Sequence, residues 1–109
     1  MEIKRGDLVV AVFPGDYGKP RPALVVQGDA FMATASVTML PLTSDLQRAP
    51  LLRITIEPNP GNGLDQTSQI MVDKAATVTR SKIGRHIGRV DDVTRRAVER
   101  ALLRFLDLG

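Results

Sequence analysis

The sequence contains no cysteine and no tryptophan, and it has only one histidine and one tyrosine. Without cysteine the chain can form neither a disulfide framework nor a thiolate metal site, and it has no cysteine nucleophile. No apolar run approaches the roughly 20 residues that a membrane-spanning helix needs, and no signal-peptide pattern follows the first residues. We therefore expect a cytoplasmic protein with no membrane segment.

The signatures of nucleotide-dependent and metal-dependent enzymes are absent as well. A single histidine excludes a metal site built from several histidines, and the acidic residues are scattered. Neither a P-loop nor a dinucleotide-binding glycine pattern occurs. No serine and no acidic residue stands out as a partner of His86 in a catalytic triad. The sequence predicts a protein that uses no metal and no cofactor.

Charge is distributed unevenly along the 109 residues, which we expect to form one domain over 1–109. The net charge is +3, yet residues 1–79 hold 7 basic and 8 acidic residues, whereas residues 80–109 hold 8 basic and 4 acidic residues. Such asymmetry is typical either of a surface that binds a polyanion or of a solvated helix face.

Short apolar runs separated by turn residues predict strands over the first two-thirds of the chain. These strands cover 8–13, 23–26, 36–42 and 52–57, and the first two form a hairpin around the turn residues 14–20. Residues 57–66 have the composition of a loop. Residues 69–78 predict a strand bent or bulged near Asp73 and Lys74, and 83–90 predict a further short strand.

The C-terminal segment alone has helical periodicity. Asp91 or Asp92 is placed to cap it. Its buried stripe is predicted from apolar spacing to comprise Val93, Ala97, Val98, Ala101, Leu102 and Phe105. The remaining surface is predicted to carry Arg95, Arg96, Glu99, Arg100 and Arg104. The fold class is therefore mainly β (α+β), a small barrel of five to seven strands with a C-terminal helix.

Polar residues at strand ends are the remaining candidates for chemistry. Arg21 lies between Pro20 and Pro22, which hold it on a stiff, extended segment, and its guanidinium matches phosphate oxygens. The alternative is a structural arginine that anchors a loop.

Four further residues have two interpretations each. Thr43 and Ser44 either form a local turn or direct a hydroxyl at a phosphate or ribose. Asp73 is either a general base or a turn-forming, salt-bridged carboxylate. His86 either takes part in acid–base chemistry near neutral pH or is a surface group.

Several sequence blocks together resemble the MazF/PemK toxin ribonucleases. They occur at 4–10 (KRGDLVV), 21–26 (RPALVV) and 41–44 (PLTS), and in the second half at 63–64 (GL), 68–73 (SQIMVD) and 81–90 (SKIGRHIGRV). Their order and spacing agree with that family over nearly the whole chain.

The resemblance implies a homodimeric SH3-like barrel that is the toxin of a type II toxin-antitoxin system. It also implies sequence-specific, metal-independent cleavage of single-stranded RNA, including mRNA, which inhibits translation and growth, and inhibition by a cognate antitoxin. The arginine of the R-P-[AV] block and the threonine of the T-S block carry over onto Arg21 and Thr43 as catalytic residues. RNA supplies its own nucleophile, the 2′-OH, so Arg21 is expected to stabilise phosphoryl charge and Thr43 to orient the substrate.

Two departures from the family concern the general acid and base. Many relatives have a glutamate or histidine in the loop before the R-P block, whereas residues 14–20 contain neither. Some relatives also carry an arginine at the position of Met71. Asp73 and His86 are therefore the weaker catalytic candidates, and catalysis by Arg21 and Thr43 alone is the alternative.

RNA contacts are expected from an aromatic residue and from cations. Tyr17 in the first loop is placed either to stack on a base or simply to be exposed. The residues expected to hold the RNA are Tyr17, Lys19, Ser44, Arg80, Lys82 and Arg85.

Two other functions fit the same fold. One is a gyrase-poison-like toxin that binds protein and cuts no RNA; such relatives typically end in Trp-Gly-Ile, whereas this chain ends Leu106-Asp107-Leu108-Gly109. The other is a catalytically inactive binding module, against which Arg21 and Thr43 argue.

Overall fold

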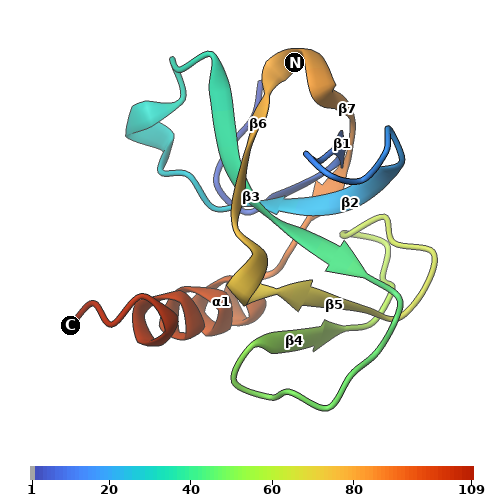
Figure 1. Cartoon of the computed structure of the whole chain (residues 1–109). Coiled ribbons are helices and arrows are strands. Elements are labelled where there is room, and N and C mark those ends of the chain that lie inside the picture. The colour runs from blue at the N-terminus through green and yellow to red at the C-terminus, as the bar shows by residue number, and fades with distance from the viewer. Residues whose placement is uncertain (1) are drawn as a thin grey trace.

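Seven antiparallel strands and a C-terminal helix make up the computed structural model, which describes residues 2–109 (Figure 1). Three short 3-10 helices, η1 to η3, connect some of the strands. The elements in chain order are β1 (Asp7–Val12), β2 (Pro20–Val25), η1 (Asp29–Phe31), β3 (Ser36–Thr43), β4 (Arg53–Ile56), β5 (Ser68–Met71), η2 (Val72–Lys74), β6 (Ala76–Thr79), η3 (Arg80–Lys82), β7 (Ile83–Arg89) and α1 (Asp92–Phe105). The predicted fold class is confirmed, and so is the hairpin formed by the first two strands.

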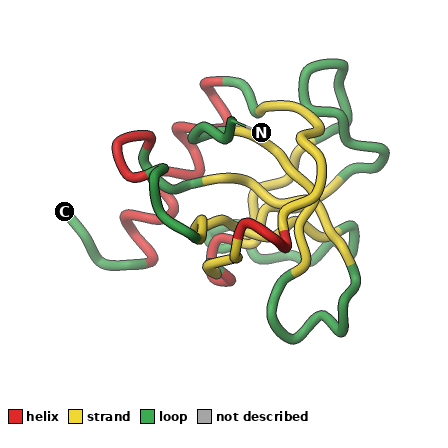
Figure 2. Tube along the Cα trace, turned by 90° about the horizontal axis from the view of Figure 1, so that it is seen from above, coloured by secondary structure: helices red, strands yellow, loops and turns green. Residues whose placement is uncertain are grey.

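The strands follow the order β4-β5-β3-β2-β1-β7, with β6 also paired to β3. In the view from above they cross one another steeply, and loops project around them (Figure 2). Helix α1 lies beside β4 and β5 and below the other strands in Figure 1. Among residues 2–109 it is the only helix longer than one turn. No helix in this part of the chain is long and apolar enough to span a membrane.

The predicted bend near Asp73 and Lys74 is confirmed, and it divides the segment into two strands. Both β5 and β6 pair with the same edge of β3, with η2 between them. Leu42 pairs with Ile70 and Met39 with Ala76, so three steps along β3 match six steps along the other segment. The 3-10 turn η2 takes up the extra residues and directs Asp73 away from the ladder.

Strand β2 begins earlier than predicted, at Pro20, although proline is normally excluded from paired strands. Pro20 and Pro22 are paired with β1, whereas the ladder between β2 and β3 begins only at Ala23. The proline positions thus have no strand partner on the β3 side, where a missing N–H costs nothing. Arg21 lies between them on this open edge.

Two buried clusters occupy the two faces of the sheet, which explains why several strands are apolar without alternation. Leu8, Leu24 and Leu40 belong to the cluster that packs against α1 through Val98. Their neighbours in sequence point the other way, and the second cluster includes Val9, Ala11, Ala23, Val25, Val37 and Met39. Alternate residues therefore enter different cores.

Helix α1 begins as predicted, with Asp91 as the N-cap, whose side chain accepts a hydrogen bond of 2.7 Å from the Thr94 N–H. The carboxylate therefore satisfies a free donor of the first turn. This bond lowers the pKa of Asp91 below its ordinary value.

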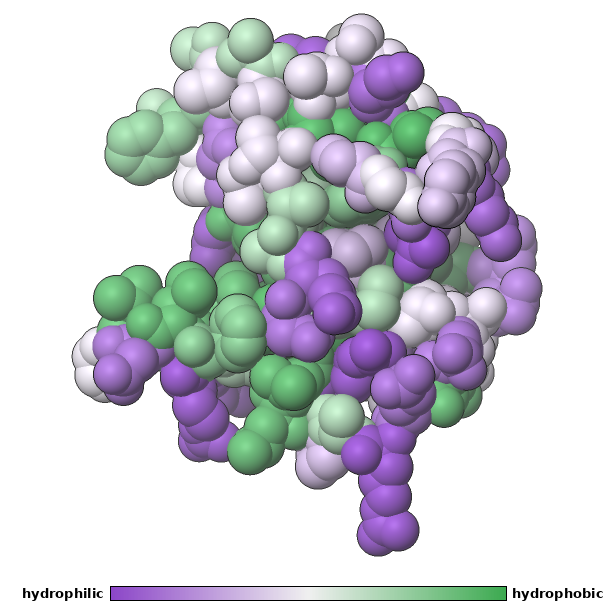
Figure 3. All heavy atoms as spheres, in the orientation of Figure 1, coloured by the Kyte–Doolittle hydropathy of each residue, from purple (hydrophilic) through white to green (hydrophobic). Residues whose placement is uncertain are grey.

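The predicted apolar stripe of α1 is wrong at both ends. Val98 is buried, and Ala97, Ala101 and Leu102 are partly buried, but Val93 is 75% exposed and Phe105 is 46% exposed. Val93 lies on the solvent side because the helix faces the core through Val98. Phe105 has the helical spacing of the buried stripe, but the last turn of α1 extends past the sheet, so its side chain is left exposed. Figure 3 shows apolar side chains gathered at this projecting end, which carries Leu103, Phe105, Leu106 and Leu108.

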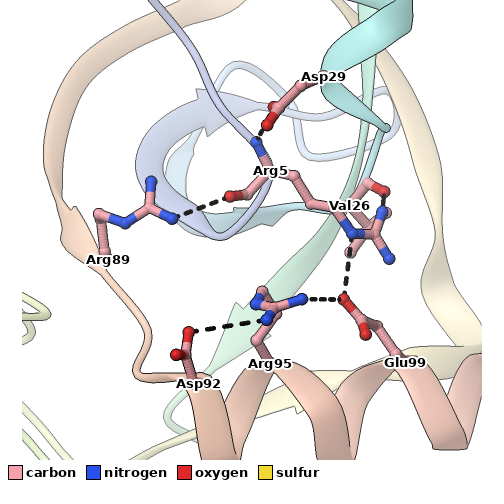
Figure 4. A network of polar contacts seen from close by, with 7 residues as sticks. All are labelled: Arg5, Val26, Asp29, Arg89, Asp92, Arg95 and Glu99. Carbon is pink, nitrogen blue, oxygen red and sulfur yellow. Dashed lines mark hydrogen bonds and ion pairs between the residues drawn. The ribbon is translucent and has the colours of Figure 1, made fainter.

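The N-terminal segment is joined to α1 by a network of charged groups (Figure 4). Glu99 Oε2 lies 3.2 Å from Arg5 Nε and 2.8 Å from Arg95 Nη1. Burial alone would raise the pKa of Glu99, but the hydrogen bonds and charges of the two arginines outweigh burial and lower it. Arg95 and Glu99 are thus partly buried rather than on the free helix surface.

Candidate active site

The start of β2 and the end of β3 lie next to a cavity of about 430 Å³, which we call the Arg21 cavity. Arg21 reaches it from the open edge of β2, and Pro41 from β3. Further lining comes from η2 and the residues after it, including Asp73 and Lys74, and the first loop contributes Asp16. Four separate chain segments therefore place two carboxylates and two cations around one cavity.

Arg21 forms an ion pair with Asp16, which also lines the Arg21 cavity. Arg21 Nε lies 2.8 Å from Asp16 Oδ2, and Nη2 donates a hydrogen bond of 3.3 Å to Oδ1. The Nε–H, however, has no aligned acceptor within the described chain. The two side chains are 29% and 23% exposed, so the guanidinium is anchored by the loop and still meets the cavity.

Asp73 brings a second carboxylate to the Arg21 cavity. Its Oδ1 is buried and has no hydrogen-bond partner among residues 2–109, whereas Oδ2 lies 3.9 Å from Lys74 Nζ. Only two buried side-chain atoms of the described chain lack a partner, Asp73 Oδ1 and Arg21 Nε, and both belong to residues that line this cavity.

Thr43 lines a second cavity of about 240 Å³, which we call the Thr43 cavity. Ser44 and Arg85 share it, and the loop before β5 contributes Asp65 and Gln66. Thr43 Oγ1 accepts a hydrogen bond of 3.0 Å from the Asp45 N–H. The predicted local turn is thus present, and its hydroxyl oxygen is fixed at the cavity.

The Arg21 and Thr43 cavities are neighbours. Arg21 and Pro41 line the first, while the next residues along each strand, Pro22 and Leu42, line the second. Arg21 and Thr43 therefore do not share one cavity, but they flank the same pair of strand ends.

A third hollow lies beside the first loop and holds Tyr17 and Lys82. Tyr17 is fully exposed, with φ at 54°, a left-handed conformation that is uncommon for a bulky residue. Lys19, near the end of the same loop, is also exposed. Three of the residues predicted to bind RNA therefore lie outside the Arg21 cavity: Tyr17, Lys19 and Lys82.

His86 and Arg80 are not brought to these cavities. His86 Nε2 lies 3.4 Å from Asp7 Oδ1, and Asp7 also pairs with Arg89. Arg80 Nε donates a hydrogen bond of 2.8 Å to the Thr34 carbonyl, so it fastens the loop after η1 to the sheet. Both side chains have structural partners, whereas Lys82 and Arg85 of the same segment reach the third hollow and the Thr43 cavity.

Asp16 is the site residue that sequence reasoning missed. We considered glutamate and histidine in residues 14–20 but not aspartate, although Asp16 precedes Arg21 by only five positions. A carboxylate in a short loop before a proline-flanked arginine was the available signal. Among residues 2–109, no three histidine or carboxylate side chains gather into a group that would hold a metal ion.

Residues 4–106 match the family described as PemK-like, MazF-like toxin of type II toxin-antitoxin system. A protein named probable endoribonuclease MazF from Mycolicibacterium smegmatis is 48% identical over 108 residues, covering 98% of this chain and 99% of that protein.

Solved structures show the same fold. An endoribonuclease in complex with its cognate antitoxin from a mycobacterial species superposes with a TM-score of 0.83 at 23% identity, over 99% of this chain and 98% of the other. MazF from Deinococcus radiodurans has a TM-score of 0.82 at 21% identity, over 98% of both chains. The family match extends across all three cavities, and the chain belongs to the PemK-like, MazF-like toxins of type II toxin-antitoxin systems.

Proposed function

We propose that this chain, acting as one domain over 1–109, is an endoribonuclease that cleaves single-stranded RNA without a metal ion. The observation that carries the proposal is the pairing of Arg21 with Asp16 in a cavity next to Thr43, within a chain 48% identical to a probable endoribonuclease. The toxin acts in the cytoplasm, where its RNA substrate is.

The reaction uses the nucleophile that RNA carries. The 2′-oxygen attacks the adjacent phosphorus, the bond from phosphorus to the 5′-oxygen breaks, and the 5′-oxygen takes up a proton from water. The products are a 2′,3′-cyclic phosphate and a 5′-hydroxyl. The enzyme must align the 2′-oxygen, accept its proton and stabilise charge on the phosphoryl oxygens.

Arg21 and Asp16 divide these tasks. Arg21 is an obligatory cation, so its guanidinium stabilises the phosphoryl oxygens and is a poor proton acceptor. The Asp16 carboxylate is the acceptor that lies against it, at 2.8 Å, and it takes the proton of the 2′-OH. Thr43, held by the Asp45 N–H, orients the neighbouring nucleotide.

The exposed residues around the cavities are proposed to bind RNA, and two protein partners are also proposed. Tyr17 stacks on a base, and Lys19, Lys82 and Arg85 hold phosphates. We also propose a cognate antitoxin as a partner, because relatives of the same fold have been solved in complexes with antitoxins. A homodimer is supported by the apolar side chains left exposed at the end of α1.

The test uses purified protein and a long single-stranded RNA in excess EDTA, followed by mapping of cut positions and chemical ends. We expect EDTA-resistant cuts at a short recurring sequence with cyclic phosphate ends, and Arg21→Ala should lose at least 100-fold in rate. Arg100→Ala is the matched control, because Arg100 is exposed on α1 before its apolar end and makes no ion pair within the described chain. Intact RNA from folded, antitoxin-free protein would contradict the proposal.

A further inference from the structure

The carboxylate of Asp73 has no task in the cleavage chemistry described above, although it lines the Arg21 cavity. Its Oδ1 is sealed from solvent without a hydrogen bond, and a buried acceptor left in this state is costly. The nearest cation, Lys74 Nζ, is 3.9 Å from the other oxygen and is largely exposed, so it compensates little.

The position of Asp73 is fixed by the fold. It follows Val72, which is fully buried in the core cluster that contains Val98, and η2 displaces it from the ladder between β3 and its neighbours. The side chain is about one-fifth exposed, and it lines the same cavity as Arg21. The cavity therefore combines an anchored cation with a fixed acceptor.

We propose that Asp73 reads a base of the RNA next to the cleaved phosphate by accepting hydrogen bonds from the exocyclic amino group of that base. This inference rests on the proposed ribonuclease function. With the phosphate on Arg21, the adjoining base would enter the same cavity and bring N–H donors to Oδ2, the oxygen of the Asp73 carboxylate that is not sealed from solvent. Asp73 is then a specificity-determining residue and not a general base.

The chemistry of a carboxylate defines which bases fit. An ionised carboxylate only accepts hydrogen bonds. Adenine, cytosine and guanine each carry an amino group on the edge that proteins read, whereas uracil presents carbonyl oxygens flanking its one N–H. The oxygens of uracil would face the oxygens of Asp73. One position next to the cut should thus accept amino-bearing bases and reject uracil.

The experiment sequences the products of a random RNA pool cut by wild-type protein and by Asp73→Asn. Asparagine keeps the shape but adds an NH₂ donor, which pairs with a uracil oxygen. We expect wild type to disfavour uracil about tenfold or more at one position beside the cut, and the variant to lose this discrimination. Asp107→Asn is the matched control, since Asp107 is exposed, makes no ion pair in the described chain and has φ of 57°, which asparagine tolerates.

A second measurement covers an Asp73→Asn protein that folds but cuts slowly. Short oligonucleotides with a 2′-O-methyl group at the cleaved position cannot react, and they are varied only at the base in question. Wild type should bind the amino-bearing versions about tenfold more tightly than the uracil version, and Asp73→Asn should bind them within about twofold of one another.

The two proposals fail in different ways. No cutting by folded wild-type protein contradicts the ribonuclease function. Cutting with an unchanged base profile in Asp73→Asn, or a uniform loss at every sequence with unchanged oligonucleotide preference, overturns base reading by Asp73 and leaves the ribonuclease function standing.

Discussion

Asp16 and Arg21 form an ion pair with 2.8 Å between Oδ2 and Nε, and this pair joins the first loop to the beginning of β2. Pro20 fixes the backbone immediately before Arg21, and the carboxylate fixes the guanidinium at the other end. The arginine is thus restrained at both its main chain and its head group. Restraint of this kind reduces the entropy that substrate binding must remove.

Replacing the carboxylate tests whether the pair is chemical or only structural. Asp16→Asn preserves shape but removes the proton acceptor, and we expect the single-turnover cleavage rate to fall about 100-fold. Since both partners are partly exposed, the free energy of unfolding should change by about 1 kcal/mol or less. A rate within threefold of wild type would show that Asp16 is only an anchor; Asp107→Asn is the charge-matched control.

Arg85 offers a test of the path that RNA takes over the Thr43 cavity. Its side chain makes no ion pair within residues 2–109, and it lines the cavity beside Thr43. Arg85→Ala should weaken binding of uncleavable RNA and reduce the slope of log affinity against log salt by about 0.7, one phosphate contact on a single strand. Arg100→Ala, on the solvent side of α1, should leave the slope unchanged. Equal slopes for wild type and Arg85→Ala would remove Arg85 from the RNA path.

Glu99 should give the protein an acid-sensitive stability. Its folded-state pKa is lowered from the ordinary 4.5, because Arg5 and Arg95 outweigh the effect of burial. Stabilisation by this group is therefore complete above about pH 4.5 and is lost as pH falls through the lowered value. We expect Glu99→Gln to cost about 1 kcal/mol at pH 7 and progressively less below pH 4.5, measured by urea unfolding. A cost that stays constant from pH 7 to 3 would contradict this account.

Gly63 should tolerate no side chain. A Cβ there would lie 2.0 Å from the carbonyl oxygen of Ile87, and its φ is +66°. Gly63→Ala should destabilise the fold by about 2–4 kcal/mol. Gly15→Ala is the control, with φ of +87° and no atom within 4 Å of its Cβ, so only backbone strain of about 1–2 kcal/mol is expected. Equal melting temperatures for the two variants would mean that the loop moves away from β7 at little cost.

Local patterns in the sequence were sufficient to predict where the strands and the helix lie, but not how these elements pack against one another. The strands, the bend near Asp73 and the cap at Asp91 were predictable because turn residues and apolar spacing are local signals. Val93 was misplaced because which face of a helix meets the core depends on the packing of distant strands.

In the candidate site, too, individual residues could be predicted from the sequence, whereas the contacts between them could not. Arg21 and Thr43 were found from family-like blocks, and both lie at cavities. The pairing of Asp16 with Arg21, the cavity shared with Asp73 and the separate position of His86 depend on how segments meet in space. A loop carboxylate and a surface histidine have the same local sequence signals whether or not they meet an arginine.

Val72 and Asp73 are consecutive residues with opposite environments, one fully buried against the core that includes Val98 and the other lining the Arg21 cavity. Any shift of that core therefore moves a wall of the cavity. If Asp73 reads a base as proposed, mutations that loosen the packing between α1 and the sheet should change which RNA sequences are cut before they unfold the protein.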